Sequence, residues 1–525
     1  MDIKQLTPML SVAPQLTCAQ VAQAGAAGFR AILCNRPDGE GPDQPTAAEI
    51  GAAARAAGLG FAYVPAVAGA LTEADAAAMR AALDSLPGPV LAYCRSGARA
   101  EKLAEMAGVL QSRDAAHYDI LIVGGGSAGI ATAASILKRR RGIRLAIIEP
   151  SEAHYYQPGW TMVGAGVFDS GFTRRDEAGL IPRGAEWIRA SASIFLPDDK
   201  QVVLDDGRRI SYGVLVVCPG IVLDWQAIPG LFDALGHDGV TSNYRYDLAP
   251  YTNRLVRQFK GGRALFTQPP MPIKCAGAPQ KAMYLSCHRW EKSGILAQSD
   301  VQFHTAGAVL FGVPAYVPAL MDYVDRYDIS VNFGSKLVEI DSACKTAIFE
   351  QVDGDRVKRV AERFDMIHVV PPQVAPDFIR TSPLASVSGF VEVDEATLRH
   401  PRYPEIFALG DACSTSNAKT MAAARKQAPV VAVNALAVLD GQPPVVTYDG
   451  YGSCPLTVEA GKIVLAEFGY GGKLMPSFPN WLIDGTRPSR LSWLLKDTIL
   501  PPVYWHGMLK GREWMVKPQM IDVRP

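Results

Sequence analysis

Residues 1 to about 110 alternate short apolar runs with alanine-rich stretches that are typical of helices. The runs Ala31–Cys34 and Pro89–Tyr93 are almost continuously apolar, and helical stretches separate them. Continuous apolar runs of this length are typical of strands in a parallel sheet with helices on its faces. The pattern predicts a small α/β domain at the start of the chain.

A second α/β pattern begins after the polar segment 111–114, where we place a domain boundary. The apolar run Tyr118–Val123 predicts a buried strand, and residues from about Ile130 to Arg139 predict a helix. Arg144–Glu149 predicts the next strand, which completes a βαβ unit. Strands and helices continue to about residue 450, and the rest of the chain is rich in proline, glycine and tryptophan.

Length and composition refine this outline. The 525 residues exceed what one hydrophobic core usually serves, and 48% of them are hydrophobic. We therefore predict a small α/β domain in residues 1–112, tandem Rossmann-like domains in 118–450 and a C-terminal region in 451–525. Formal net charge is zero with 20% charged residues, which gives no argument for a nucleic-acid partner.

Targeting and redox signals are sparse. The segment Met1–Gln5 carries an acidic residue where a signal peptide carries basic ones, so secretion is not expected. No run of eighteen uninterrupted apolar residues is present to predict a membrane span. The nine cysteines are dispersed and do not form a disulfide framework, so any disulfide is expected to be catalytic. We predict no metal site.

The turn Gly124–Gly129 follows the strand of the βαβ unit and has the spacing G-x-G-x-x-G. The first glycine permits a tight turn, the second lets the backbone approach a pyrophosphate, and the third allows close packing of helix on strand. The helix N-terminus then faces the phosphates, and an acid at the end of the second strand accepts from ribose hydroxyls, which favours FAD or NAD over NADP. The cofactor contacts predicted here are Gly124, Gly126, Ser127, Gly129 and Glu149.

A second segment favours FAD over NAD. Ile406–Ala412 resembles the Gly-Asp motif of flavoproteins with two dinucleotide domains, which predicts Gly410 and Asp411 beside the ribityl-pyrophosphate part of FAD. Val216–Gly220 stands where those proteins usually have Ala-Thr-Gly, so Gly220 is a predicted contact. The cysteine within it, Cys218, is expected to be a small core residue.

The middle of the chain lacks a second glycine fingerprint, which an NAD(P)H site requires. The predicted strand Arg263–Thr267 runs into Gln268–Pro272, which contains three prolines. Proline has no backbone N–H, so this segment is a poor phosphate-binding helix start. A nicotinamide substrate is therefore disfavoured.

Three motifs, His154–Gly166, Pro272–Lys281 and Tyr448–Leu456, resemble those of sulfide:quinone oxidoreductases, in particular the branch that includes the mitochondrial enzymes. The resemblance runs from about residue 118 to the C-terminus. It implies that Cys275 and Cys454 lie on opposite walls of a pocket beside the flavin and hold a disulfide or a sulfur-bridged form of it.

The resemblance also implies a mechanism. Hydrosulfide attacks the bridge by thiol-disulfide exchange, leaving a persulfide on Cys275 and a thiolate on Cys454 that passes an electron pair to FAD and on to quinone. It places Lys419 near the isoalloxazine ring, where a cation stabilises reduced flavin, and adds Gln157 to the cofactor contacts. The cysteines expected to be inert are Cys18, Cys34, Cys287, Cys344 and Cys413.

The C-terminal region mixes Trp, Tyr and Leu with Lys and Arg. The region from Ser489–Lys496 through Leu500–Lys510 is broken by Pro501 and Pro502, and it predicts two short amphipathic helices. Composition fits packing on the protein's own core as well as a bilayer interface, and the resemblance favours a membrane surface, where a lipid-soluble quinone is reached. We therefore predict a peripheral protein on the cytoplasmic side of a membrane.

The N-terminal domain has its own cysteine loop, Tyr93–Arg99, between a predicted strand and a predicted helix over Ala100–Val109. Backbone amides around Cys94 at a helix N-terminus favour the thiolate and bind anions. Four residues separate Cys94 from Arg99, as in a rhodanese-like loop, whereas tyrosine phosphatases have five. Residues 1–110 look like the phosphatase-like domain that is joined to persulfide-handling enzymes in bacteria.

Three hypotheses follow. The first is an FAD enzyme that oxidises sulfide and reduces quinone, with Cys94 relaying the sulfur to a small acceptor such as sulfite, glutathione or another thiol. In this hypothesis Arg99 and the loop amides hold an anionic co-substrate such as sulfite or thiosulfate. The second is an NADH:quinone reductase. The third is a thiol redox sensor whose N-terminal domain is a phosphatase, with Asp38 as general acid. The expected partners are sulfide, quinone, a small sulfur acceptor and a membrane surface, without nucleic acid, and a homo-oligomer is compatible with each hypothesis.

Overall fold

The structure, a computed structural model, describes residues 1–7, 9–42, 44–109, 116–354 and 356–521. The chain divides into two compact units, Met1–Tyr118 with Ala190–Tyr212, and Asp119–Arg189 with Gly213–Pro525. The boundary predicted at 111–114 lies outside the described residues. The division into 1–112, 118–450 and 451–525 stays a prediction.

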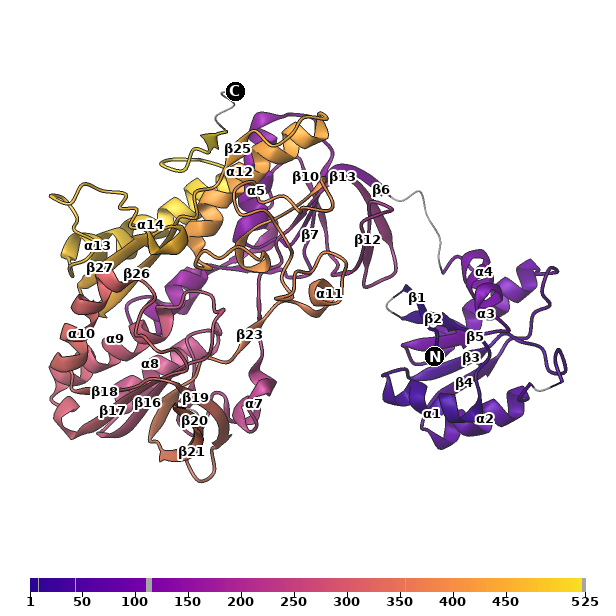
Figure 1. The fold of residues 1–525 in the computed structure, drawn as a ribbon, viewed down its shortest axis with the longest axis horizontal. Helices are drawn as coiled ribbons and strands as arrows, with labels where there is room; N and C mark the ends of the chain where they lie inside the picture. The colour runs from indigo at the N-terminus through magenta and orange to yellow at the C-terminus, as the bar shows by residue number, and fades with distance from the viewer. Residues whose placement is uncertain (8, 43, 110–115, 355, 522–525) are drawn as a thin grey trace. The chain divides into compact units, whose positions relative to one another are not determined.

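The N-terminal domain is a five-stranded sheet with a pair of helices on each face (Figure 1). The strand order is β1-β2-β5-β3-β4, and the neighbours are parallel except for β1 with β2. The first three helices each follow a threonine that forms a capping box, which satisfies free amides of the first turn. The elements are β1 (Lys4–Thr7), β2 (Leu10–Ala13), α1 (Cys18–Ala26), β3 (Ala31–Cys34), α2 (Ala47–Ala56), β4 (Gly60–Tyr63), α3 (Glu73–Ser85), β5 (Val90–Tyr93) and α4 (Ala98–Met106).

The βαβ unit lies in a seven-stranded sheet of order β10-β7-β6-β13-β12-β11, with β24 paired to β13. Strands β6, β7 and β10 are parallel, as are β13 and β24, whereas β11, β12 and β13 are antiparallel. Helix α5 begins at Ser127, three residues before the predicted start, because Gly126 is already its extended N-cap. The elements are β6 (Ala116–Val123), α5 (Ser127–Arg139), β7 (Leu145–Ile148), β10 (Ala185–Ile188), β11 (Ala192–Leu196), β12 (Gln201–Leu204), β13 (Arg209–Val217), β24 (Ile406–Ala408) and α12 (Met421–Leu439).

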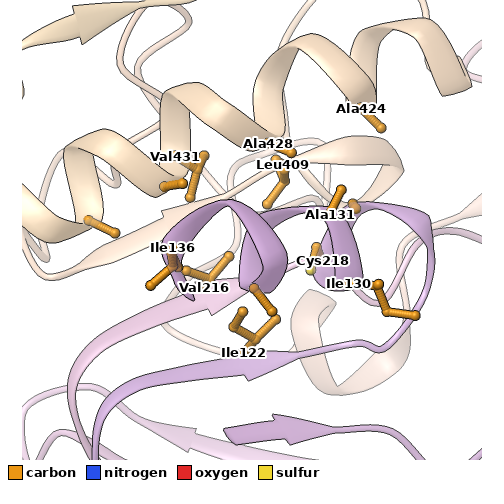
Figure 2. Close-up of a cluster of buried hydrophobic side chains, with 14 of the residues drawn as sticks. Ile122, Ile130, Ala131, Ile136, Val216, Cys218, Leu409, Ala424, Ala428 and Val431 are labelled. Atoms are coloured by element: carbon orange, nitrogen blue, oxygen red, sulfur yellow. The ribbon is translucent and has the colours of Figure 1, made fainter. Parts of the chain in front are cut away.

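The core of this region lies between α5, α12 and the sheet (Figure 2). Small residues such as Ala131 and Ala428 allow the two helices to approach closely, and Ile122 and Val216 fill the space below α5. Cys218 belongs to this cluster and is 4% exposed. It is therefore a small core residue at the glycine turn, as expected.

A second parallel sheet has the order β15-β22-β16-β17-β18. Helices α8 and α9 contact each other, and α9 contacts β16 and β17. The elements are β15 (Val240–Thr241), α8 (Leu248–Gln258), β16 (Gly262–Gln268), α9 (Ala278–Ser293), β17 (Ser299–Thr305), α10 (Val317–Arg326), β18 (Ile329–Asn332) and β22 (Met366–His368), with the antiparallel strands β19 (Ser335–Asp341), β20 (Thr346–Asp353) and β21 (Arg356–Arg363).

The C-terminal region contains the hairpin β26 (Gly452–Glu459) and β27 (Lys462–Phe468), and β26 packs against α9. The two predicted helices are a succession of short turns, α13 (Arg490–Leu494), a π-helical turn at Leu495–Ile499, α14 (Leu500–Pro502) and a further π-helical turn at Val503–Gly507. The prolines do not interrupt this succession because they lie in the first positions of α14, where a backbone N–H is not required. No helix among the described residues is long and apolar enough to cross a membrane.

Shorter elements complete the chain. They are β8 (Ala153–Tyr155), α6 (Trp160–Gly164), β9 (Arg174–Asp176), β14 (Val222–Leu223), α7 (Leu231–Ala234), β23 (Gln373–Val374), α11 (Asp377–Arg380), β25 (Val446–Thr447) and β28 (Gln519–Met520).

Candidate functional site

The glycine turn has the geometry that its sequence predicts. Gly124 has φ of 106°, and a Cβ there would lie 2.6 Å from the carbonyl oxygen of Cys218. A Cβ at Gly129 would lie 1.9 Å from the carbonyl oxygen of Gly124, so only glycine lets α5 pack this closely. No atom lies within 4 Å of a Cβ built at Gly126. The backbone at Gly126 is therefore open to an approaching ligand at the start of α5.

Glu149 lies at this turn, after the end of β7. Its Oε2 accepts a hydrogen bond from the backbone N of Gly125 at 2.8 Å, and its Oε1 accepts one from the backbone N of Ser151 at 2.7 Å. Burial raises the pKa of the Glu149 carboxyl, and the two amide hydrogen bonds oppose that rise. Each oxygen keeps a lone pair that can accept from a ribose hydroxyl.

The predicted Gly-Asp motif adjoins the same helix. Gly410 has φ of 70°, and a Cβ there would lie 3.4 Å from the Cβ of Ala128 on α5. Burial raises the pKa of the Asp411 carboxyl, while the ammonium groups of Lys419 and Lys274 lower it. Gly220, with φ of 86°, has no atom within 4 Å of its Cβ position.

Lys419 connects this motif to the sulfur site. Its Nζ donates to the carbonyl oxygens of Cys413 at 2.7 Å and Asp411 at 3.0 Å. Its own carbonyl oxygen accepts a hydrogen bond from the backbone N of Cys275 at 2.8 Å. Gln157 is tied to the same neighbourhood, because its Oε1 accepts from Lys274 Nζ at 2.7 Å. The structure thus brings together four parts of the chain, namely Gln157, residues 274–275, residues 411–413 and Lys419.

Cys275 and Cys454 meet although they are far apart in the sequence, with their sulfurs 3.5 Å apart. Cys275 lies between β16 and α9, and its φ of 52° is unusual for a residue with a side chain. Cys454 lies on β26, which packs against α9. A disulfide requires about 2.05 Å between sulfurs, so a small movement would let these two bond.

Gly277 makes this approach possible. A Cβ at this position would lie 2.6 Å from Cys454 Sγ and 2.3 Å from Leu456 Cδ2. Glycine is therefore required by close packing and not by φ, since no positive φ is present here.

Two buried lysines lie beside the cysteines. Lys281, in the first turns of α9, donates to Cys275 Sγ at 3.2 Å and is 2% exposed. A hydrogen bond from Cys454, together with the Lys281 ammonium, lowers the pKa of Cys275 well below its ordinary 9.0. The same hydrogen bond and burial raise the pKa of Cys454 well above that value. In the reduced pair the negative charge therefore resides on Cys275.

Lys496 approaches from the π-helical turn that follows α13. Its side chain is buried, and its Nζ donates to the carbonyl oxygen of Pro158 at 3.3 Å. Burial and the nearby Lys281 charge lower the pKa of Lys496 to about 8, although the cysteine sulfurs oppose the shift. Its ammonium form is therefore sensitive to pH close to neutrality.

The N-terminal cysteine lies at the end of β5. The Sγ of Cys94 accepts a hydrogen bond from the backbone N of Gly97 at 3.2 Å, and Gly97 is the N-cap of α4. The thiol is buried at 1% exposure. The amide contact is the kind that stabilises a thiolate at a helix N-terminus.

Arg99 is engaged by the protein itself. Its guanidinium donates to a Glu40 carboxylate oxygen at 2.6 Å and to the carbonyl oxygen of Ala66 at 2.8 Å. Arg36 donates to the other Glu40 oxygen at 2.8 Å. The Oδ1 of Asp38 accepts from the backbone N of Ala47 at 2.7 Å, at the start of α2.

Curated relatives share most of the chain. It is 39% identical to the mitochondrial sulfide:quinone oxidoreductase of Dictyostelium discoideum over 86% of its own length and 96% of that protein. It is 38% identical to the mouse mitochondrial enzyme over 75% of its length and 87% of that protein. The chain belongs to the sulfide:quinone oxidoreductase family. This confirms the resemblance inferred from the three sequence motifs.

Two further comparisons describe the parts of this family member. The crystal structure of the sulfide:quinone oxidoreductase from Aquifex aeolicus matches with a TM-score of 0.62, covering 78% of this chain and 98% of that one at 18% identity, which supports the same fold. Residues 2–110 match the family model for the phosphatase-like domain of beta-lactamase hydrolase-like proteins. The predicted order of a phosphatase-like α/β domain before a flavoprotein is confirmed.

FAD is the cofactor of this family, and the residues present fit it. The open backbone at Gly126 and the free space at Gly220 leave room for a ligand along the glycine turn. Glu149 offers carboxylate acceptors at that turn, and Asp411 is buried between Lys274 and Lys419. FAD would be held by these residues.

Sequence reasoning missed several residues of the site. Lys281 lies within a motif quoted for the resemblance, but its direction towards Cys275 follows from its position on α9, six residues after the cysteine. Lys496 gives no local signal, because its neighbourhood reads as an amphipathic surface helix. Gly277 lies two residues after Cys275 in a run of small residues, and this position could have suggested that it is needed for close packing.

Proposed function

We propose that this chain oxidises sulfide at Cys275 and Cys454, with FAD as cofactor and a quinone as electron acceptor. The observation that carries the proposal is the 3.5 Å approach of the two sulfurs beside the ammonium of Lys281. Both cysteines adjoin the residues that fit FAD, through the hydrogen bond between Cys275 and Lys419. Membership of the sulfide:quinone oxidoreductase family supports the same activity.

The chemistry starts from the disulfide form of the pair. A hydrosulfide ion attacks Cys275 Sγ, the Cys275–Cys454 bond breaks, and a new sulfur–sulfur bond leaves a persulfide on Cys275 and a thiolate on Cys454. An acceptor thiolate or sulfite then takes the outer sulfur and leaves Cys275 as a thiolate. Reformation of the disulfide from the two thiolates releases two electrons. When bound, FAD supplies the two-electron acceptor that is reoxidised by quinone.

Cys275 suits the role of persulfide carrier. The ammonium of Lys281 lies 3.2 Å from its sulfur, so negative charge on Cys275 or on its outer sulfur is stabilised there. Cys454 is fully enclosed on β26 and has a raised pKa in the reduced pair. A thiolate on Cys454 is therefore less stable than one on Cys275.

An NADH:quinone reductase is the second candidate, and the second sheet disfavours it. The loop after β16 leads through Pro272 to Cys275, and the N-terminus of α9 is occupied by Cys275 and Lys281. A nicotinamide dinucleotide requires a glycine-rich phosphate loop at this point of a Rossmann-like domain.

We also propose that the enzyme is a peripheral protein on the cytoplasmic side of a membrane, where it meets its quinone. Large apolar side chains of the C-terminal region are exposed, and Trp481 is 84% exposed. The exposed residues Arg487 and Arg490 lie close in sequence to these apolar side chains. Exposed apolar side chains together with arginines suit the interface of an anionic bilayer. The later segment around Tyr504 and Leu509 instead packs on the protein's own core. The exposed side chains in question are Leu474, Trp481, Leu482, Leu491, Leu494 and Ile499.

For the N-terminal domain we propose sulfur transfer through Cys94. A Cys94 thiolate attacks the outer sulfur of a small persulfide, the donor leaves as a thiolate, and sulfite or another thiolate then takes the sulfur from Cys94. The amide of Gly97 supports the thiolate. A phosphatase role for Asp38 is disfavoured, because its carboxylate already accepts a hydrogen bond from the backbone N of Ala47, the first residue of α2. Arg99, already paired with Glu40, is proposed to position the loop.

Two assays test these proposals. Sulfide-dependent reduction of a short-chain quinone should fall by at least about a thousandfold in Cys275→Ser, since a missing nucleophile removes most of the rate. A retained rate contradicts the proposed function. Thiosulfate formation from glutathione persulfide and sulfite should fall in Cys94→Ser but not in Cys18→Ser, which changes an exposed cysteine of the same domain. Equal rates in the two variants contradict sulfur transfer by Cys94.

A further inference from the structure

The C-terminal segment Leu500–Glu513 packs along α5, the helix that starts at the glycine turn. Glu513 accepts hydrogen bonds from Ser135 at 2.7 Å and from Arg139 at 2.5 Å, and Lys138 Nζ donates to the carbonyl oxygen of Gly511 at 2.9 Å. A Cβ at Gly511 would lie 2.8 Å from the carbonyl carbon of Ala134, so the two backbones are in close contact. The end of α5 is thus held by the end of the chain.

The same segment reaches the start of α5 through a buried chain of polar groups. The hydroxyl of Tyr504 lies 2.6 Å from the Oγ of Ser127, the first residue of α5. It also hydrogen bonds to Nε2 of His154, whose Nδ1 lies 3.0 Å from Oε2 of Glu177. Tyr504, His154 and Glu177 are all buried.

Glu177 has one oxygen that this chain of groups does not use. Its Oε1 is buried and has no hydrogen-bond partner among the described residues. This oxygen lies 2.8 Å from the Cβ position of Gly125, on the same turn that binds Glu149. A buried carboxylate oxygen without a donor is destabilising, so a ligand that donates a hydrogen bond to it removes that cost.

Chemistry identifies the donor. Glu177 and Glu149 both adjoin Gly125, and an acid at this turn is where a dinucleotide presents the hydroxyls of its adenosine ribose. A hydroxyl satisfies a carboxylate oxygen, whereas a phosphate would be repelled by it. We propose that Glu177 is a second carboxylate that binds the adenosine half of FAD, and that Tyr504 couples this binding to docking of the segment Leu500–Glu513.

The coupling has a physical route. Tyr504 donates or accepts at both Ser127 and His154, and His154 fixes the orientation of Glu177. When the segment Leu500–Glu513 undocks, Tyr504 leaves this series of hydrogen bonds. His154 and Ser127 then lose their buried partner. Binding of FAD and docking of the segment therefore favour each other by the same factor. The inference rests on FAD as cofactor and is independent of the identity of the reductant.

The test is the dissociation constant of FAD, measured by flavin fluorescence during titration of the apoprotein. Glu177→Gln and Tyr504→Phe should each raise the constant at least about tenfold, the effect of losing one charge-assisted or buried hydrogen bond. Both changes preserve shape, and Tyr504→Phe retains the ring contacts with Tyr156 and Trp505. The matched control is Tyr327→Phe, which removes another buried hydroxyl, bonded to the carbonyl oxygen of Val458.

Trypsin cleavage after the exposed residues Lys510 and Arg512 measures docking directly. FAD should slow this cleavage in the unmodified protein and protect Tyr504→Phe much less. Unchanged FAD affinity in Glu177→Gln and Tyr504→Phe, or a loss matched by Tyr327→Phe, would overturn the binding role. Cleavage indifferent to FAD would overturn the coupling. A protein that binds FAD as described but is not reduced by sulfide contradicts the proposed function and leaves this inference standing.

Discussion

Replacing Lys281 by methionine removes the positive charge nearest to the sulfur pair while filling a similar volume. The Nζ of Lys281 lies 3.2 Å from Cys275 Sγ. Two unit charges at this separation attract by about 5 kcal/mol in a medium of effective dielectric constant about 20, which is an upper bound for a site that can relax. A charge-assisted hydrogen bond in proteins contributes about 1.5–3 kcal/mol. The pKa of Cys275 should therefore rise by about one to two units in Lys281→Met.

The assay is the rate of alkylation of Cys275 by iodoacetamide in the reduced enzyme, followed by mass spectrometry as a function of pH. Because only the thiolate reacts, the midpoint of this profile reports the pKa of Cys275. Lys281→Arg retains the charge and should keep a low midpoint. Lys292→Met changes an exposed lysine at the other end of α9 and serves as the control. A midpoint in Lys281→Met equal to that of the unmodified protein would refute the role assigned to Lys281.

Three further predictions concern packing, pH and the membrane. Gly277→Ala places a Cβ 2.6 Å from Cys454 Sγ, so the unfolding free energy should fall by about 1–3 kcal/mol. The rate of quinone reduction should fall as well. Gly312→Ala, where no atom lies within 4 Å of the Cβ position, should change neither quantity. Lys496 has a folded pKa of about 8, below its ordinary 10.5, so its buried charge costs stability below pH 8. Lys496→Met should then raise the unfolding free energy by roughly 3 kcal/mol at pH 7, and this gain should vanish as pH rises towards 10.5, as measured by denaturant titration. Trp481→Ser should weaken co-sedimentation with anionic phospholipid vesicles, and an equal loss in Phe232→Ser would contradict a C-terminal membrane surface.

The βαβ unit could be predicted in detail because its signals are local. The glycines at the turn are fixed by contacts within a few residues of the chain, such as that between Gly129 and the carbonyl oxygen of Gly124. The apolar strand before them needs no tertiary information, since burial on both faces requires a continuous apolar run. The position of the acidic residue Glu149 could be predicted from the length of the βαβ unit, because it stands at the end of the second predicted strand.

The sulfur site could be inferred only through the resemblance. Nothing in the two local sequences says that a cysteine after β16 meets a cysteine on β26, because their meeting depends on the packing of α9 against that strand. The contributions of Lys496 and Tyr504 were hidden for the same reason. Their segment is amphipathic, and the pattern shows that one face is buried without showing what that face contacts.

The C-terminal helices illustrate a related limit. Pro501 and Pro502 suggested a break between two helices, whereas the structure has α14 and π-helical turns in succession through this region. Proline signals a break only where its missing N–H and its ring conflict with a preceding turn. The sequence alone does not show whether the turn before a proline is already widened.

In the proposed function, sulfide reduces the flavin of this protein through Cys275 and Cys454. The measurement that tests it most directly is the visible flavin spectrum of the anaerobic protein, titrated separately with sulfide and with NADH and then mixed with a short-chain quinone. Sulfide should bleach the flavin and NADH should not, quinone should restore the oxidised spectrum, and sulfide should not bleach the flavin of Cys275→Ser. Bleaching by NADH, or bleaching by sulfide that persists in Cys275→Ser, would contradict it.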